Sequence, residues 1–234
     1  MAFEMEKLEE RYYGALRGIT KSFDISETVA KDDLPTLLEE DTSGRLSHSN
    51  IWFLSGISGS GKSTIVKMLE HRGFGRLPNV VTRPRRPEES EQDNVFVDDN
   101  TFIQMEQRGE LFHPHITNGA RHAVLKKDIE HLVGGKHRLY MDKSVRSVAR
   151  LLKEYPTLRH STFIYVLPPS FSVLRQRIME RESEASRTHV LTEANIISRF
   201  DEEIQQIEET LAIPYVYVVN DSVNRVKKKL KPYT

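Results

Sequence analysis

The segment SGISGSGKST, at positions 55–64, is the strongest structural signal in the chain. Four apolar residues precede it at 51–54, and a helical pattern of apolar residues follows at 62–72. The segment therefore predicts a strand, a glycine-rich turn and a helix, and it matches the pattern G-x-x-x-x-G-K-[ST]. This pattern is typical of a loop that binds phosphate groups, and the alternative is a flexible Gly/Ser turn.

Each residue type in this loop has a chemical reason. Glycines allow the backbone to curl so that several N–H groups point at one anion, and the helix that begins near Gly61 adds the positive end of its dipole. The Lys62 ammonium can reach the β- and γ-phosphates, and the Ser63 hydroxyl can bind Mg²⁺. The predicted phosphate-binding residues are Gly56, Ser58, Gly59, Ser60, Gly61, Lys62, Ser63 and Thr64.

Composition narrows the class of protein. The chain has 234 residues with 34 Lys+Arg and 34 Asp+Glu, and this zero net charge argues against a general nucleic-acid coat. It has no cysteine, which excludes disulfides and thiolate metal sites and makes a reducing cytoplasm the expected compartment. No apolar run approaches transmembrane length, and the acidic start MAFEMEKLEE is unlike a targeting peptide, so we expect no membrane partner.

The first part of the chain differs from the rest. Residues 1–48 are polar and begin with a pattern that predicts an amphipathic helix. We expect this extension to pack loosely on the domain that follows at 49–234. The alternative is an arm that binds a partner or forms a homodimer.

From residue 50 onward, strand and helix patterns alternate, which predicts an α/β fold with a parallel sheet covered on both faces. Ligands of such folds gather at the carboxyl ends of the strands. The strand candidates lie at 51–55, 80–82, 138–141, 163–167 and 215–219, and the helix candidates lie at 62–72, 99–108, 125–133, 144–154, 171–182 and 192–211.

A second group of charges follows the strand candidate at 80–82. Arg83, Arg85 and Arg86 lie within four residues, and one guanidinium group can donate two parallel hydrogen bonds to two phosphate oxygens. A second anion site near the first is what phosphoryl transfer to a phosphorylated acceptor requires. The alternative is a solvated basic loop.

A third group of charges predicts a lid. The polar span 181–193 could bring arginines over a triphosphate and exclude water, although some of these arginines could instead pair with glutamates on the same helices. The arginines in this part of the chain are Arg175, Arg177, Arg181, Arg187 and Arg199.

Asp142 ends the apolar strand LYMD. A carboxylate there could hold Mg²⁺ through water or accept a bond from the acceptor. Alternatively, it only caps the next helix.

Taken in order, these motifs resemble those of guanylate kinase, from about residue 50 to 231. The resemblance implies a P-loop three-layer α/β fold with a five-stranded parallel sheet, a small inserted acceptor-binding lobe at about 83–125 and a mobile lid at about 181–195. The motifs that carry it are GISGSGKST (56–64), TRPRRPEE (82–89), FVDDNTF (96–102), GELFH (109–113), LYMD (139–142), LPPS (167–170) and VND (219–221).

The resemblance also implies an activity, the transfer of the γ-phosphoryl group of ATP, with Mg²⁺, to a small phosphorylated acceptor. Position by position, it implies that Lys62 and Ser63 hold the ATP phosphates and the metal, and that Arg83 and Arg86 bind the acceptor's phosphate. It also implies that Arg181 and Arg199 stabilise the transferring group. Asn220 would lie beside the adenine and Asp142 near the acceptor.

The base-reading positions depart from the family pattern. The family reads guanine with a glutamate, two serines and two tyrosines. Here His113 replaces the glutamate, Asn79 and Val124 replace the serines, and Asn94 and His122 replace the tyrosines. Because guanine presents N–H donors that need an acceptor carboxylate, the guanine specificity is doubtful.

The acceptor is therefore left open. A nucleoside monophosphate or related compound leads. The alternatives are GMP or dGMP in a rearranged pocket, a sugar phosphate as in the ribose-bisphosphate kinases that resemble guanylate kinase, and a non-catalytic binding module. A metal site at His113, His115 and His122 is also an alternative, but no nearby carboxylate completes it, so we expect these histidines to line the acceptor pocket.

Overall fold

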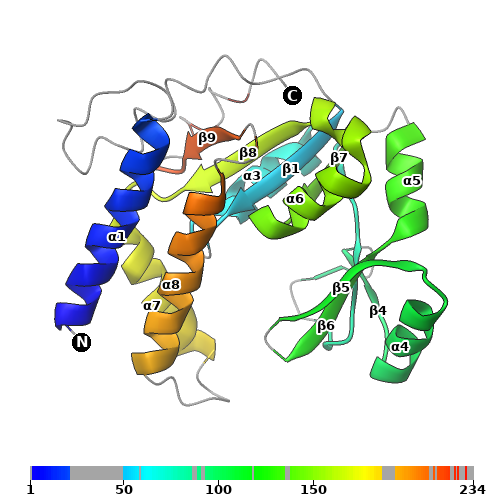
Figure 1. The fold of residues 1–234 in the computed structure, drawn as a ribbon, viewed down its shortest axis with the longest axis horizontal. Helices are drawn as coiled ribbons and strands as arrows, with labels where there is room; N and C mark the ends of the chain where they lie inside the picture. Colours follow the sequence, from blue (N-terminus) through cyan, green and yellow to red (C-terminus); the bar gives the residue numbers. More distant parts are fainter. Residues whose placement is uncertain are drawn as a thin grey trace.

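The computed structural model (Figure 1) describes most of the chain. The described residues are 2–21, 50–57, 59–85, 89–90, 93–117, 119–134, 138–185, 193–210, 213, 215–221, 224, 226 and 230. They form a parallel sheet with helices on both faces, a small lobe beside it, and an N-terminal helix that packs on the main body.

The central sheet has five strands in the order β2-β7-β1-β8-β9, and every pairing in it is parallel. This confirms the predicted five-stranded parallel sheet. The carboxyl ends of β1 and β7 lie together, because Leu54 is in register with Asp142. The strand bounds are β1 Ile51–Gly56, β2 Gly75–Arg76, β7 Leu139–Asp142, β8 Thr162–Leu167 and β9 Val216–Val219.

One strand prediction was wrong in its placement. The run expected at 80–82 forms β3 (Asn79–Val81), but β3 belongs to the smaller sheet, and the edge of the central sheet is the two-residue strand β2. A short apolar run carries no information about which sheet it joins. Gly75 and Arg76 form too short a strand to leave any hydrophobic pattern.

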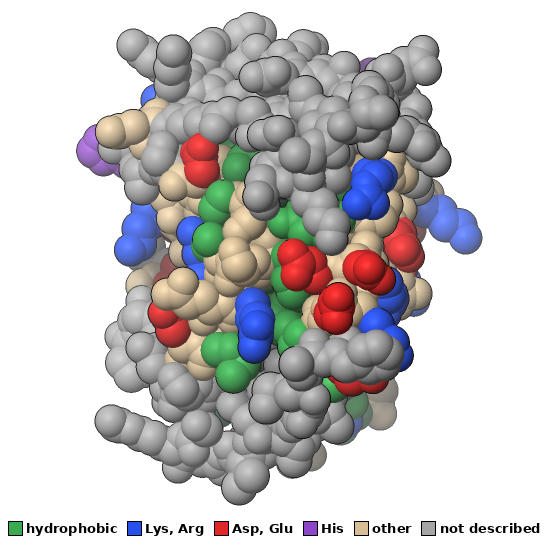
Figure 2. Space-filling model, turned by 90° about the vertical axis from the view of Figure 1, so that its left-hand side faces the viewer, with side chains coloured by type: hydrophobic (Ala, Val, Ile, Leu, Met, Phe, Trp, Pro, Cys, Tyr) green, Lys and Arg blue, Asp and Glu red, His purple; other side chains and the backbone are tan. Residues whose placement is uncertain are grey.

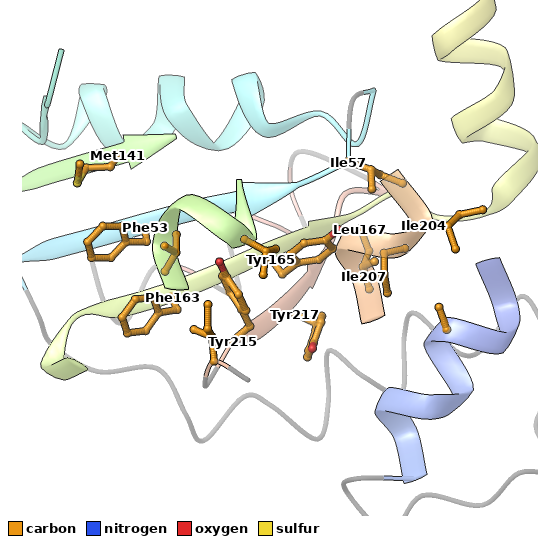
Figure 3. Close-up of a cluster of buried hydrophobic side chains, with 14 of the residues drawn as sticks. Phe53, Ile57, Met141, Phe163, Tyr165, Leu167, Ile204, Ile207, Tyr215 and Tyr217 are labelled. Atoms are coloured by element: carbon orange, nitrogen blue, oxygen red, sulfur yellow. The ribbon is translucent and has the colours of Figure 1, made fainter. Parts of the chain in front are cut away.

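Two hydrophobic layers cover the sheet, because neighbouring side chains along a strand point to opposite faces. Phe53, Phe163 and Tyr165 face the larger cluster, in which Figure 3 shows the aromatic side chains lying along one side of the strands. Phe53 and Phe163 stack there with ring centroids 5.1 Å apart. Trp52 and Ile164 face the other cluster, which packs against α3. The predicted three-layer arrangement is therefore present.

The covering helix α6 has a clear sequence signal. α6 is amphipathic, with Val148 and Leu151 among its buried residues, and Ser144 caps its start by accepting a bond from the Ser147 N–H. The helices around the sheet are α3 Lys62–His71, α5 Lys126–Gly134, α6 Val145–Glu154, η3 Pro156–His160, α7 Phe171–Ala185 and α8 Glu193–Glu209.

The small lobe is built on a four-stranded sheet in the order β4-β3-β6-β5. Its own core includes Val80, Phe102, Leu111 and Ala123. This is the inserted lobe that the sequence places at about 83–125, with β3 joining it from four residues earlier. Its remaining elements are β4 Asn94–Phe96, α4 Asp99–Gln107, β5 Leu111–Thr117 and β6 Ala120–Leu125.

The N-terminal helix α1 (Ala2–Lys21) is present, as the sequence predicts, but the expected loose packing is wrong for it. Leu8, Tyr12 and Leu16 are buried in the same hydrophobic cluster as the sheet. Figure 1 shows α1 beside α7 and α8, and the Arg11 guanidinium bonds to the Asp201 carboxylate of α8. Residues 22–49 of the extension lie outside the described residues.

The outer face of α1 is polar. Glu6, Lys7, Glu10 and Arg11 are exposed on it, and Figure 2 shows this side of the molecule with acidic and basic side chains around hydrophobic ones. Among the helices that the structure describes, none has the length and apolar character to cross a membrane.

Candidate active site

The glycine-rich loop has the conformation that its sequence predicts. Gly56, Gly59 and Gly61 have φ angles of 148°, 82° and 89°, which side-chain-bearing residues rarely adopt. A Cβ atom on Gly56 would lie 2.5 Å from the Val166 carbonyl oxygen, and one on Gly61 would lie 1.8 Å from the Asn220 amide nitrogen. Gly56 is therefore required by space as well as by backbone angle, and at Gly61 a side chain would be strained by the backbone angle and would displace the Asn220 amide.

The start of α3 fits an anionic ligand. Gly61 is its N-cap and has no side chain to cap the helix, so the N-cap residue leaves the first N–H groups of α3 available to a ligand. In the described part of the chain, the buried Ser60 hydroxyl also has no hydrogen-bond partner. The Lys62 ammonium donates to the carbonyl oxygens of Gly56 at 2.6 Å and Ile57 at 3.3 Å. It thus lies across the loop, where phosphate oxygens could replace these carbonyls.

Two side chains brace the loop from outside. Arg177 donates to the carbonyl oxygens of Gly59 at 3.2 Å and Ser60 at 3.4 Å. The Asn220 side-chain amide donates to Ser60 at 3.1 Å and to Gly61 at 3.3 Å. Asn220, expected beside the adenine, therefore contacts the loop backbone directly.

Arg83 is held by a carboxylate. Its guanidinium makes a two-pronged contact with Glu89, one bond of which is 2.6 Å long, and it lies over the Phe96 ring at 5.8 Å. Such a paired and stacked guanidinium has little freedom to turn away. Arg86, the second predicted phosphate contact, lies outside the described residues.

A chain of polar contacts joins Arg83 to the carboxyl end of β7. The Lys143 ammonium donates to the Asn79 side-chain oxygen. The Asn79 amide donates to Asn94 at 3.4 Å, and the Asn94 amide donates to Glu89 at 3.4 Å. Asn94 is buried, so its contacts with neighbouring polar groups replace water.

Asn79 and Lys143, from this chain of contacts, line a pocket of about 390 Å³ between the main body and the small lobe, whereas Arg83, Glu89 and Asn94 lie outside its lining. Four residues expected to bind the acceptor line it, namely Asn79, His113, His122 and Asp142. The structure adds His115, Lys143, Ser144, Arg146, Ser147 and Arg150 to the lining.

His113 has an unusual backbone conformation, and its contacts indicate which ring nitrogen carries the proton. Its φ angle is 51°, and the β5–β6 pairing shifts register between Phe112 and His115, which is the mark of a β-bulge. Burial, followed by His115 and the charges of Arg150 and Lys143, lowers the pKa of His113 to about 4. Its imidazole is therefore neutral near pH 7. Because Arg150 can only donate, its 2.9 Å contact with Nδ1 leaves the proton on Nε2.

The three histidines form a stack. The rings of His113 and His115 lie 4.7 Å apart at 23°, and those of His115 and His122 lie 5.7 Å apart at 25°. His115 Nδ1 donates to the His113 carbonyl oxygen at 2.9 Å. Within the described ranges, no group of histidine and acidic side chains could hold a metal ion. The arrangement supports the pocket-lining role of these histidines.

Lys143 is anchored to the central sheet. Its backbone N–H donates to the Leu54 carbonyl oxygen at 2.9 Å, and its own carbonyl oxygen accepts from the Ser55 hydroxyl at 2.7 Å. Burial lowers the pKa of its ammonium to about 8, an effect that Asp142 opposes and Arg76 adds to. Lys143 therefore remains largely charged at neutral pH.

Other predicted residues lie elsewhere or cannot be placed. Val124 is buried opposite Phe112 in the core and does not line the pocket. Arg181 and Arg199 belong to α7 and α8 by backbone, but their side chains lie outside the description. Ser58 and the central part of the lid, 186–192, also lie outside the described residues.

Sequence reasoning missed Lys143, Arg150 and the loop contact of Arg177. Two signals could have found the first two residues. Lys143 directly follows the carboxyl end of a strand, where ligands gather, and Arg150 lies four positions after Arg146 on the same face of α6, the helix that follows this strand end. The contact of Arg177 depends on how α7 docks, and no local pattern contains that information.

Comparisons with known proteins agree with this geometry. The family model for guanylate kinase matches residues 48–234. A guanylate kinase of Thermotoga maritima is 32% identical over 141 residues, which cover 57% of this chain and 65% of that protein. One of Nitrosomonas europaea is 26% identical over 162 residues, which cover 65% of this chain and 79% of that protein.

A solved structure supports the fold. The crystal structure of guanylate kinase from Anaplasma phagocytophilum matches with a TM-score of 0.57 and 21% sequence identity, over 80% of this chain and 85% of that chain. At this level of identity, the likeness speaks for the fold alone.

Proposed function

The chain belongs to the guanylate kinase family and is an ATP-dependent kinase, and from this premise we propose that it phosphorylates a small phosphorylated acceptor and that GMP is a poor acceptor for it. A nucleoside monophosphate or a related compound is the proposed class of acceptor. The observation that supports this is the position of a phosphate-binding loop and a polar pocket at the same carboxyl edge of the sheet.

The donor side uses the loop and the start of α3. Lys62 and Ser63 would hold the phosphates and the metal, and the uncapped N–H groups of α3 would face the phosphate oxygens. When bound, ATP with Mg²⁺ supplies the phosphoryl group and part of the balancing charge. The protein contributes position and charge, since this reaction needs no covalent intermediate on a side chain. We assign Arg181 and Arg199 to the lid that neutralises the transferring group.

On the acceptor side, Arg83 is held in place by Glu89 and would take the acceptor's phosphate together with Arg86. Beyond that phosphate, the pocket presents N–H donors around the position where the family has a glutamate, and Asp142 is the one carboxylate among its described lining residues. The His113 Nε2–H is a donor, as are the groups of Lys143 and Arg150. This mismatch supports the proposal that guanine is read poorly.

A screen for ADP release tests the proposed function. The chain is mixed with ATP and Mg²⁺ and offered GMP, dGMP, AMP, CMP, UMP, dTMP and sugar phosphates in turn. We expect at least one acceptor to raise ADP release well above the rate without acceptor. We also expect Lys62→Ala to abolish this release while leaving thermal unfolding unchanged, since the loop is formed mainly by backbone. Undiminished turnover in that variant would remove the loop from the reaction.

A further inference from the structure

We infer that the pocket between α6 and the β5–β6 hairpin binds a second anionic group of the acceptor, either a phosphate or a carboxylate. The inference rests on the proposed function, in which the acceptor's first phosphate lies at Arg83. It names the class of acceptor more closely, as a small molecule with an anionic group at each end.

The wall formed by α6 carries unbalanced positive charge. Lys143 directly precedes the N-cap of α6, Arg146 and Arg150 lie four positions apart on the helix, and all three line the pocket. Arg146 is balanced by Glu209, with contacts of 2.7 and 2.9 Å. Lys143 and Arg150, in contrast, donate to neutral groups, an amide oxygen and an imidazole nitrogen.

One charge opposes this assignment. Asp142 is the single carboxylate among the described residues that line the pocket, and it lies beside Lys143 in the chain. Among the described lining residues, two cations against one carboxylate leave a positive balance. The start of α6 at Val145 adds the positive end of a helix dipole.

The opposite wall presents a donor as well. Because Arg150 occupies Nδ1 of His113, the remaining ring nitrogen carries a proton. The stack of His115 and His122 behind it supports this ring. A phosphate or carboxylate offers only acceptor oxygens at neutral pH, so it matches a site whose two walls both donate.

The same features oppose an uncharged base. A base with no anionic group would cover Lys143 and Arg150 without balancing them, and an unpaired buried charge is costly. The volume of about 390 Å³ is enough for a small ligand. A run of contacts from Lys143 through Asn79, Asn94 and Glu89 to Arg83 links the residues of the two proposed anion positions.

Matched pairs of compounds test the inference in equilibrium binding to the full chain, which needs no turnover. One pair is ribose 5-phosphate and ribose 1,5-bisphosphate, and another is glycerol 3-phosphate and 3-phosphoglycerate. In isothermal titration calorimetry, we expect the doubly anionic member of at least one pair, meaning the compound with two anionic groups, to bind at least about 10-fold more tightly than the compound with one. The first pair reports a second phosphate and the second reports a carboxylate.

Variants locate the effect. Arg150→Met and Lys143→Met should each reduce binding of the favoured doubly anionic compound by about 10- to 100-fold, while binding of its singly anionic partner changes less than about 3-fold. Lys153→Met removes a cation from α6 outside the pocket lining and is the matched control, with no expected change. Arg150 is exposed, so its variant should fold even where the Lys143 variant does not.

The outcomes separate this inference from the proposed function. If the doubly anionic compounds show no advantage, or the advantage survives both variants, the second anion site does not exist, even where the ADP screen finds an acceptor. If the screen finds no acceptor but the advantage depends on Lys143 and Arg150, the anion site stands and the proposed reaction falls.

Discussion

Lys143 lies where the parallel sheet meets the proposed acceptor pocket, and the ionisation of its ammonium leads to a prediction about pH dependence. Burial lowers its pKa from 10.5 to about 8, so the ammonium loses its charge as the pH rises through about 8. At saturating ATP, kcat/KM for the acceptor should therefore fall above this pH. Phosphate groups of substrates finish ionising near pH 6 to 7, so they do not account for this falling limb of the pH profile above about pH 8.

The variant Lys143→Arg is the control for that profile. A guanidinium stays protonated throughout the range, so the fall above about pH 8 should disappear or move well upward. Asp142 and Arg76 are the other charged groups that act on Lys143, and Asp142→Asn should move the limb to lower pH, because Asp142 stabilises the charged form. An unchanged limb in Lys143→Arg would show that another group titrates.

Arg83 and Glu89 give a second prediction about single residues. Arg83→Ala should lower acceptor kcat/KM by about 30- to 150-fold with little change for ATP. It also leaves the Glu89 carboxylate without this partner, facing the acceptor's phosphate. Adding Glu89→Gln should then recover part of the loss, whereas Arg85→Ala, a change to an exposed neighbour, should cost little. Equal losses for ATP and acceptor would place Arg83 outside the acceptor site.

Single residues also show what the sequence could and could not predict about the site. The phosphate loop was predictable because its glycines and lysine act through local backbone geometry, at Gly56 to Lys62. The position of Val124 outside the pocket was not predictable, because its burial against Phe112 follows from the register of β5 and β6. The Asn220 contact with the loop likewise depends on two segments that are 160 positions apart.

At the level of secondary structure, the limits have the same origin. Strong patterns such as that of α6 were predicted nearly to the residue. The edge strand β2 was missed because two residues carry no periodicity, and β3 was given to the wrong sheet because pairing partners are set by tertiary structure. The packing of α1 was underestimated for a related reason, since an amphipathic pattern predicts a helix without showing what covers its apolar face.

The packing of α1 leads to a stability prediction. Leu16 is fully buried between α1 and the main body, so Leu16→Ala should lower the free energy of unfolding by about 2–5 kcal/mol, with a drop in Tm of several degrees. Glu10→Ala, on the exposed face of the same helix, should change it by less than about 0.5 kcal/mol. Urea and thermal unfolding measure both. Equal, small effects would mean that α1 is not part of the cooperative core.

α1 also connects the start of the chain to the elements around the donor site. The Tyr13 hydroxyl accepts a bond from the Phe171 N–H at 3.3 Å, at the first residue of α7. α7 carries Arg177, which contacts the phosphate loop, and α8 carries Arg199 and is tied to α1 through Asp201. A segment outside the match to the family model therefore packs on both helices that flank the lid.

For the molecule as a whole, the carboxyl edge of the central sheet carries a proposed donor half and a proposed acceptor half, which are assembled differently. The proposed donor half depends on one continuous segment, the end of β1 and the start of α3. The proposed acceptor half is assembled from the small lobe and from the segment that runs from the end of β7 into α6. We therefore expect that phosphoryl donation and acceptor choice can change independently.

This separation leads to the prediction about GMP. We expect kcat/KM for GMP to be at least about 100-fold below that of the best acceptor in the screen. Guanine presents N–H donors to the donors of His113, Lys143 and Arg150, and two unmatched buried polar groups at roughly 1–3 kcal/mol each already give that factor. A side-by-side measurement of GMP against the other monophosphates and the sugar phosphates checks it.

A pair of variants tests the reason for this preference. His113→Glu alone should recover little GMP activity, because the new carboxylate would be neutralised by Arg150, which now contacts the His113 ring at 2.9 Å. His113→Glu combined with Arg150→Met should recover more, since the carboxylate is then free to accept guanine N–H groups. Val124→Ser should add nothing, because position 124 is buried away from the pocket. If unmodified protein already used GMP best by an order of magnitude, the donor-rich pocket would not determine the choice of acceptor.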